Sequence, residues 1–192
     1  MADDIVHTRL RDGTKVCLRA LRASDEARVR QGIADLSDRS RYLRFFSGAR
    51  EMPPSVIQNL VNVDGQQHIA WGAIETESDD DRAIGACHAI YNDEISAAEF
   101  SIGVLDEYHS LGLSRILIAR TLLACDAVGI DTLRAVVLAE NKKALRLLKA
   151  LGAQASGRDG TMVTLDFNTT TAISMLSDMT EVEGLRDVFK SV

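Results

Sequence analysis

One stretch near the middle of the chain restricts the possible folds more than any other. Residues 97–105 are typical of a strand, residues 106–112 of a short turn that ends at a glycine, and residues 113–128 of a long helix with an apolar stripe. An almost continuously apolar run follows at residues 133–139, as expected for a strand covered on both faces. This succession predicts a layered α/β protein.

The flanking sequence adds strands and helices in an irregular order. Further strands are expected over residues 14–22, 68–75, 83–91 and 161–167. Further helices are expected over residues 24–36, 37–46, 53–61 and 141–151. We therefore expect a single mixed, mostly antiparallel sheet flanked by helices. An acidic link at residues 76–82 is predicted to be a hairpin loop, and its tip, Asp79 to Asp81, is expected to be solvated rather than to bind a metal.

The end of the chain carries a separate helical signal. Apolar residues recur there every three positions, at Ile173, Leu176, Met179, Val182, Leu185 and Val188. This amphipathic stripe must be covered by something, and Gly184 is expected to divide it into two helices. We predict a main domain over residues 1–167 and a helical extension over residues 168–192 that packs on the domain or on a partner subunit, which leaves a homodimer possible.

Composition excludes several kinds of partner. A net charge of −6 argues against a general nucleic-acid or anionic-membrane binder. The longest apolar run, residues 116–130, contains Arg120 and Asp126 and is shorter than the roughly 20 residues of a membrane span. The three cysteines have no metal-ligand spacing, and the first residues lack the apolar core of a signal peptide. We therefore expect a cytoplasmic protein without a metal site.

The turn before the long helix is suited to binding an anion. Backbone N–H groups at a helix N-terminus converge on one point, and Gly112 would let the chain approach a phosphate without a Cβ. The turn has neither the Gly-Lys-Ser/Thr of a Walker loop nor a GxGxxG pattern, which disfavours nucleotide triphosphates and dinucleotides.

The same segment resembles motif A of the GNAT superfamily, the acyl-CoA-dependent N-acetyltransferases. That motif is an apolar strand ending in Val-x-Pro-x-Tyr, followed by Gln/Arg-x-x-Gly-x-Gly/Ala at the start of a helix. The positions in register with it are Val104, Tyr108, His109, Gly112 and Ser114. Asp106 stands at the usual proline position, and His109 and Ser114 depart from the usual residue types.

Three other stretches resemble the same family in the correct order. Residues 140–152 are similar to its motif B, and residues 18–25 to its first strand and the start of its first helix. Residues 40–46, together with Glu99, are similar to the branch that includes bacterial protein lysine acetyltransferases. The resemblance covers residues 11–167 and implies a GNAT-like fold.

The resemblance also implies where acetyl-CoA, the co-substrate, would lie. Its pantetheine arm would pair with the strand edge between Ile102 and Val104, and the Val104 N–H would stabilise the thioester oxygen. Asn141 would contact the pantetheine or a water, or cap a helix. The pyrophosphate would lie over the turn, on His109, Leu111, Gly112, Leu113, Ser114 and Arg115.

Proton transfer is the second requirement of such a reaction. The register with the family makes Glu99 the expected general base, although an outward-facing, salt-bridged glutamate is the alternative. Leu148 stands where many relatives carry the tyrosine that is proposed as their general acid. Tyr108 is therefore the remaining candidate for a general acid. His88 and His109 are weaker candidates for acid–base catalysis. Arg39, Arg41 and Arg44 would contact the cofactor phosphate or form a solvated face, and Phe45 and Phe46 would border the acyl group or pack in the core.

These residues predict an N-acetyltransferase that moves an acetyl or similar acyl group from acetyl-CoA to a primary amine by direct attack. The amine would belong to a protein lysine or a small molecule. The alternative is a non-catalytic acyl-CoA sensor or interaction module of the same fold, favoured by the altered turn and by Leu148.

Overall fold

The computed structural model describes residues 5–77 and 81–191 and contains one eight-stranded sheet. The strand order is β1-β2-β3-β4-β5-β6-β8-β7, and every neighbouring pair is antiparallel except β5 and β6. The strands are β1 (Val6–Arg9), β2 (Lys15–Ala20), β3 (His68–Glu75), β4 (Ala83–Asn92), β5 (Ala97–Val104), β6 (Thr132–Leu138), β7 (Gln154–Asp159) and β8 (Met162–Asn168). The expected mixed, mostly antiparallel sheet is confirmed.

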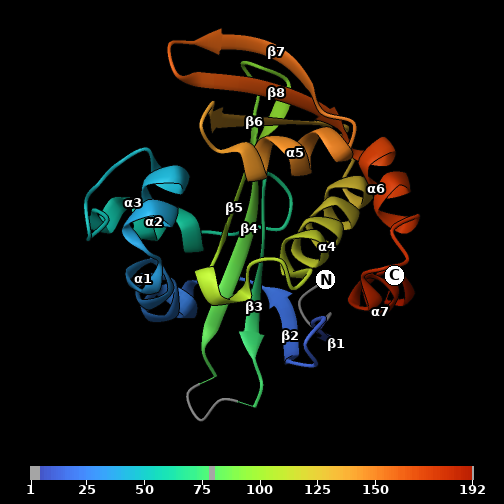
Figure 1. The fold of residues 1–192 in the computed structure, drawn as a ribbon. Helices are drawn as coiled ribbons and strands as arrows, with labels where there is room; N and C mark the ends of the chain where they lie inside the picture. Colours follow the sequence, from blue (N-terminus) through green and yellow to red (C-terminus); the bar gives the residue numbers. More distant parts are fainter. Residues whose placement is uncertain (1–4, 78–80, 192) are drawn as a thin grey trace.

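Helices cover both faces of the sheet (Figure 1). Three lie on one side, namely α1 (Glu26–Asp35), α2 (Asp38–Phe45) and α3 (Pro54–Val61). The other side carries α4 (Leu113–Ala127), α5 (Lys142–Ala150), α6 (Thr169–Ser177) and α7 (Glu183–Lys190). Helix α4 is the centre of the core, because Ile116, Leu117 and Ile118 are all fully buried. A helix this apolar on all sides needs cover from the sheet and from other helices.

The sheet divides between β5 and β6. These two strands pair only at Ala98–Leu133 and Glu99–Arg134, and beyond that point they separate. Figure 1 shows the result: the antiparallel strands β3, β4 and β5 lie upright in the view, while β6, β7 and β8 cross the top of the molecule. The second half of β5 therefore has one edge paired with β4 and one edge open.

Two strands differ from the expectation. The predicted strand at residues 14–22 is β2, and it is preceded by β1, which the sequence did not indicate because it is only four residues long. Strand β7 was also missed. All six of its residues are exposed, so it has no apolar alternation to recognise.

The acidic residues at positions 79 and 80 and the first four residues lie outside the described part of the chain.

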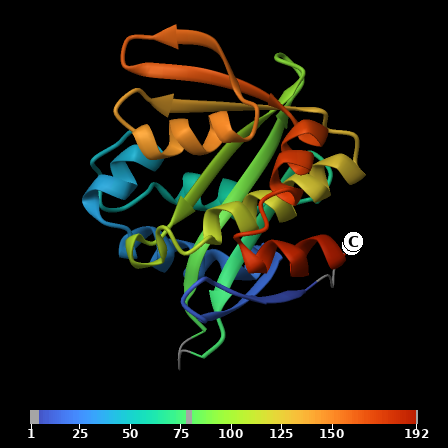
Figure 2. The ribbon, with the colours of Figure 1, turned by 45° about the vertical axis from the view of Figure 1, so that its right-hand side comes forward.

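The tail packs against the rest of the same chain (Figure 2). Helices α6 and α7 contact α4, and α7 also contacts β1, where Thr8 Oγ1 donates to Asp187 Oδ2 at 2.7 Å. The break between the two helices lies at residues 178–182, not at Gly184, which is buried inside α7. Leu176, Val182, Leu185 and Val188 are buried as their spacing predicted. The division at residue 168 remains a prediction.

Replacing Gly184 by alanine is expected to destabilise the protein by about 1–3 kcal/mol through overpacking. An added Cβ would lie 2.5 Å from Ile116 Cδ1, 2.8 Å from Thr8 Oγ1 and 2.9 Å from the Arg9 carbonyl oxygen. Thermal denaturation should show a Tm about 2–10 °C lower. Gly48→Ala is the control, since nothing lies within 4 Å of its added Cβ. Equal changes in the two variants would contradict this packing.

Candidate active site

A groove of about 800 Å³ runs between α2, the open half of β5 and the N-termini of α4 and α5. It brings together most of the site residues predicted from the sequence, which are Ile102, Val104, His109, Gly112, Ser114, Arg115 and Asn141. The side chain of Leu113 is fully buried and that of Leu111 packs on the core, so these two offer only backbone groups. Glu99 is not among the residues that line this groove.

The open edge of β5 presents backbone N–H groups to the groove. The Leu105 N–H donates to the Ile84 carbonyl of β4 at 3.0 Å. Successive residues of a strand direct their N–H groups to opposite sides, so those of Ile102 and Val104 face away from β4. Because β6 has separated from β5 at this level, no strand of residues 5–77 and 81–191 pairs with them there. This edge can therefore accept an extended ligand as an added strand.

Gly112 has a structural role in addition to the one expected, which remains a prediction. It is the N-cap of α4 and has a φ of +95°, which non-glycine residues rarely adopt. A Cβ at this position would lie 2.9 Å from Val182 Cγ1 in the tail. The glycine thus allows the turn and the close packing of the tail. The Arg115 N–H already donates to the Gly112 carbonyl at 3.0 Å, so the N–H groups of Leu113 and Ser114 are the ones that the start of α4 offers to a ligand.

The mouth of the groove is strongly basic. Six basic side chains line the groove against two acidic ones, in a protein whose net charge is −6. Lys142, Lys143 and Arg146 are exposed on the first turns of α5, where a positive charge opposes the helix dipole. Three exposed basic side chains at a helix N-terminus repel the positive end of the helix dipole, and a bound anion would offset that repulsion. Their presence there therefore indicates a binding site for an anion. Sequence reasoning did not select these three residues, although their position after the cap Asn141 was the available signal.

The arginines of α2 have three different roles. Arg39 Nη2 forms an ion pair with Glu140 Oε2 across the groove at 2.9 Å. Arg41 is buried, donates to the Leu36 carbonyl at 2.9 Å and pairs with Asp38, so it is structural. Arg44 Nη2 donates to Ser101 Oγ of β5 at 2.7 Å. Only Arg39 and Arg44 line the groove.

Asp106 joins the turn after β5 to the start of α2. Its carboxylate accepts from Ser37 N at 3.2 Å and from the hydroxyls of Ser37 and Ser40 at 2.9 Å each. His109 connects the same turn back to β5, because its Nε2 lies 3.0 Å from the Val104 carbonyl oxygen. Partial burial raises the pKa of Asp106, but the hydrogen bonds from Ser40 and Ser37 outweigh it, so the pKa is lowered overall.

Asp106→Ala is expected to lower the free energy of unfolding by about 1 kcal/mol. This is less than the sum expected for three buried hydrogen bonds, because the carboxylate is exposed and its charge is screened by water. Since the folded-state pKa lies below the ordinary 3.8, this contribution is present above about pH 4 and is lost as the pH falls through the folded-state value. Urea denaturation at neutral and acidic pH measures the difference. A difference between wild type and variant that grows on acidification would contradict the prediction.

The candidate acid and base lie outside the groove. The Tyr108 hydroxyl donates to Glu75 Oε2 of β3 at 2.8 Å, and burial together with this bond raises the pKa of Tyr108 to about 12. Glu99 is exposed on the sheet face that carries α2, at the point where β5 and β6 separate, and its Oε1 accepts from Asn92 Nδ2 at 3.0 Å.

Asn141 caps α5, since its Oδ1 accepts from Ala144 N at 3.1 Å.

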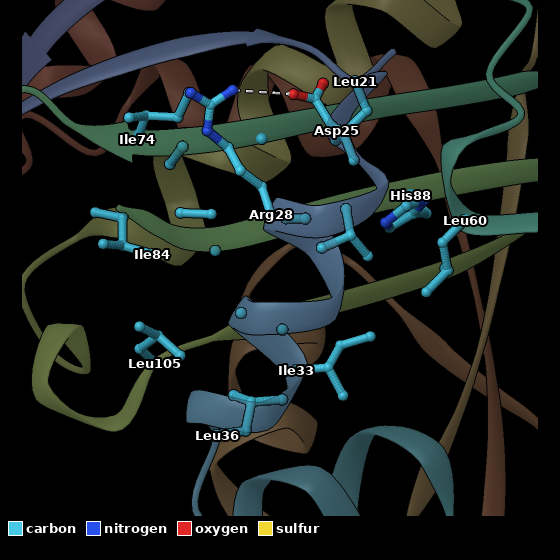
Figure 3. Close-up of a pocket in the computed structure, with 18 of the residues that line it drawn as sticks. Leu21, Asp25, Arg28, Ile33, Leu36, Leu60, Ile74, Ile84, His88 and Leu105 are labelled. Carbon is cyan, nitrogen blue, oxygen red and sulfur yellow. Dashed lines mark hydrogen bonds and ion pairs between the residues drawn. The ribbon is translucent and has the colours of Figure 1, made fainter. Parts of the chain in front are cut away.

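Two smaller cavities open beside the groove. One, of about 70 Å³, lies between the diverging β5 and β6 and is bordered by the buried Leu148. The other, of about 90 Å³, lies between α1 and the sheet (Figure 3). Arg44 borders all three spaces.

Two searches of the described residues gave negative results. Over residues 5–77 and 81–191, none of the helices has the length and apolar character needed to cross a membrane. The same residues contain no group of three or more histidine, cysteine, aspartate or glutamate side chains able to hold a metal ion.

Comparison with known proteins identifies the family. Residues 15–154 match the family model described as an acetyltransferase (GNAT) domain. A protein of Pseudomonas aeruginosa named as an acetyltransferase is 31% identical over 143 residues, which are 74% of this chain and 77% of that protein. The acetyltransferase Pat of Mycolicibacterium smegmatis is 26% identical over 152 residues, which are 77% of this chain but only 44% of Pat.

Solved structures agree with the fold. The crystal structure of the GNAT domain of S. lividans PAT matches with a TM-score of 0.78 and 20% identity, covering 88% of this chain and 98% of that domain. The family and the branch expected from the sequence are therefore confirmed. The chain belongs to the GNAT family of acetyl-CoA-dependent N-acetyltransferases.

Proposed function

We propose that this protein transfers the acetyl group of acetyl-CoA to a primary amine, with a protein lysine as the preferred acceptor. The single observation that carries the proposal is the groove, which leads from a basic mouth to an open strand edge at the division of the sheet. The resemblance of residues 40–46, together with Glu99, to the branch that includes bacterial protein lysine acetyltransferases supports a protein acceptor. A cytoplasmic location remains a prediction.

The residues fit acetyl-CoA along the length of this groove. Lys142, Lys143 and Arg146 would neutralise its phosphates together with Arg115 and the N–H groups that begin α4. The edge of β5 at Ile102 and Val104 would pair with the amides of the pantetheine arm. Acetyl-CoA supplies the thioester, and the protein supplies position and charge.

The distance between the proposed base and the oxyanion donor favours Ile102 over Val104. Strand β5 pairs with β4 without a register shift, so three residues span about 10 Å and five about 17 Å. A carboxylate at Glu99 can act through one or two waters on an amine near Ile102, but not on one near Val104. We therefore propose the Ile102 N–H as the donor to the thioester oxygen and the Val104 N–H as a contact for the pantetheine arm.

The proposed reaction needs a base more than an acid. The amine nitrogen forms a bond to the thioester carbon, the carbon–sulfur bond breaks, and the amine proton passes through water to Glu99. The sulfur leaves as a thiolate, whose conjugate acid has a pKa near about 8.5, so it departs without an enzymatic proton donor. The apolar Leu148 is compatible with this chemistry.

Tyr108→Phe is expected to change kcat by less than about twofold between pH 6 and pH 10, because the hydroxyl binds Glu75 away from the groove. The rate should rise with pH as the amine loses its proton and then level off. Measured kcat against pH for both proteins checks this. An alkaline decline in wild type that disappears in Tyr108→Phe would make Tyr108 the acid.

The acceptor assignment has its own experiment. Purified protein and acetyl-CoA are incubated with lysine-containing peptides and, separately, with small primary amines, and the products are identified by mass spectrometry. Acetylated peptide formed with a higher kcat/KM than any small-amine product is the expected result. Acetylation confined to small amines would overturn the preference for protein lysine but keep the reaction.

A further inference from the structure

The guanidinium of Arg44 lies at the inner end of the groove, on the same sheet face as Ser101 and Gly103. Its Nη2 donates to Ser101 Oγ at 2.7 Å, and its carbon Cζ lies 4.7 Å from the centre of the Phe45 ring. Its stem passes over Gly103, where an added Cβ would still be 3.9 Å from Arg44 Cγ. The arginine stem is therefore packed over the backbone of β5 at this residue, at ordinary van der Waals distance from where a Cβ would be.

Arg44 has no acidic partner among the residues that the structure describes. The other enclosed arginines of the α1–α3 side differ in this respect, since Arg41 pairs with Asp38 and Arg19 pairs with Asp25. Burial lowers the pKa of Arg44 to about 10, which leaves it charged at neutral pH. Arg44 is half-buried, and a partly desolvated cation without a counter-charge is unfavourable, so an anionic ligand would stabilise it.

The cavity between α1 and the sheet is shown in Figure 3. Arg44 is one of its lining residues, so the cavity gives such a ligand a place beside it. Its floor is the row Gly72, Ala86 and Gly103, which are paired across β3, β4 and β5 and carry almost no side chain. Its walls are apolar, with Leu21, Val29, Ile33 and Leu60 among them. A volume of about 90 Å³ holds several water-sized groups, because about 10–15 Å³ is enough for one.

The remaining polar groups of this cavity do not neutralise Arg44. His88 lines the cavity, and its Nδ1 lies 3.2 Å from Nε2 of His68, which stands behind it and does not line the cavity. Burial and the nearby Arg44 charge lower the pKa of His88 well below 6.5, so His88 is neutral at pH 7. Asp25, which also lines the cavity, is already bound by Arg19 and Arg28.

The position of Arg44 separates it from the phosphates of the cofactor. The basic residues of the mouth line only the large groove, whereas Arg44 also lines both inner cavities. It lies beside the part of β5 where the proposed function puts the reacting groups.

We propose, as a deepening of the proposed function on which it rests, that Arg44 binds the carboxylate of a substrate. The planar guanidinium suits a carboxylate, and Ser101 and the apolar cavity would hold the short chain that carries it. The carboxylate could belong to the acyl group, as in a dicarboxylic acyl-CoA, or to the amine acceptor, as in a free amino acid. In both cases the amine nitrogen replaces the thiolate on the acyl carbon, and the carboxylate itself is not changed.

Two matched substrate pairs distinguish the sources. Acetyl-CoA and succinyl-CoA are compared with one peptide amine, and 1,5-diaminopentane and free lysine are compared with acetyl-CoA. Wild type should prefer the carboxylate-bearing member of one pair by about 10- to 100-fold in kcat/KM, as one charge-assisted hydrogen-bond pair provides. Arg44→Gln should abolish this preference, measured as the ratio of the two kcat/KM values in a pair, and Arg44→Lys should keep part of it.

Arg30→Gln is the control variant, because Arg30 is exposed, forms an ion pair with Glu26 on α1 and does not line the groove. No preference in wild type for either pair, or a preference that survives in Arg44→Gln, would overturn the proposal. Absence of transfer with every substrate would instead count against the proposed function.

The carboxylate site is then tested by titrating glutarate into wild type and Arg44→Gln and following the arginine Nε–Hε signals by NMR. Saturable shifts in wild type alone support the site, and equal spectra in the two proteins overturn it.

Discussion

Replacing Lys142, Lys143 and Arg146 together by glutamate is expected to weaken acetyl-CoA binding by about 100- to 1000-fold. These side chains are exposed at the mouth of the groove, so the change should leave the fold and the Tm nearly unaffected. Each one would exchange an attraction to a phosphate for a repulsion. Isothermal titration calorimetry at low salt gives the Kd directly, and binding to wild type should weaken as salt is added.

A variant with the same change of charge elsewhere is the control. Arg30, Arg158 and Arg186 are exposed and do not line the groove. Their replacement by glutamate should change the Kd by less than about threefold at physiological salt, because distant exposed charges are screened. Equal losses in the two triple variants would mean that only the overall charge matters, and the groove would lose its assignment.

Glu99→Gln is expected to lower kcat by about 100-fold and to leave the Kd for acetyl-CoA unchanged, because the carboxylate acts on the amine proton and touches no phosphate. The amide keeps the size of the side chain and an oxygen that can accept from Asn92. Steady-state kinetics together with calorimetry separates the two quantities.

Glu181→Gln provides the comparison, since Glu181 is an exposed glutamate in the loop between α6 and α7. It should retain the wild-type kcat. Normal turnover by Glu99→Gln would remove the base assignment and leave the outward-facing glutamate as the correct interpretation.

The central part of the fold was predictable because the signal there is strong. The strand at residues 97–104, the glycine turn and α4 combine buried apolar patterns with a matching family motif, and the structure has all three. Strand β7 was not predictable from periodicity, because an edge strand with six exposed residues carries no pattern. Position in the sheet, and not composition, determines that it is a strand.

The site was predictable where it depends on the backbone and not where it depends on distant contacts. The motif indicated the open edge at Ile102 and Val104 and the turn at Gly112. It did not indicate that Gly112 packs on Val182, seventy positions later, or that Tyr108 turns toward Glu75. Nor does any local pattern tell Arg41, which pairs with Asp38, from Arg44, which has no acidic partner among the described residues. Such differences arise only when the chain is folded.

The central claim is that this groove binds acetyl-CoA in order to transfer its acetyl group to an amine. The most direct measurement is the release of free thiol from acetyl-CoA by purified protein, with and without a lysine-containing peptide. We predict thiol release that requires the peptide, equals the amount of acetylated peptide formed, and falls about 100-fold in Glu99→Gln. Acetyl-CoA that binds tightly but releases no thiol with any amine would contradict the claim and identify the protein as a non-catalytic acyl-CoA-binding module.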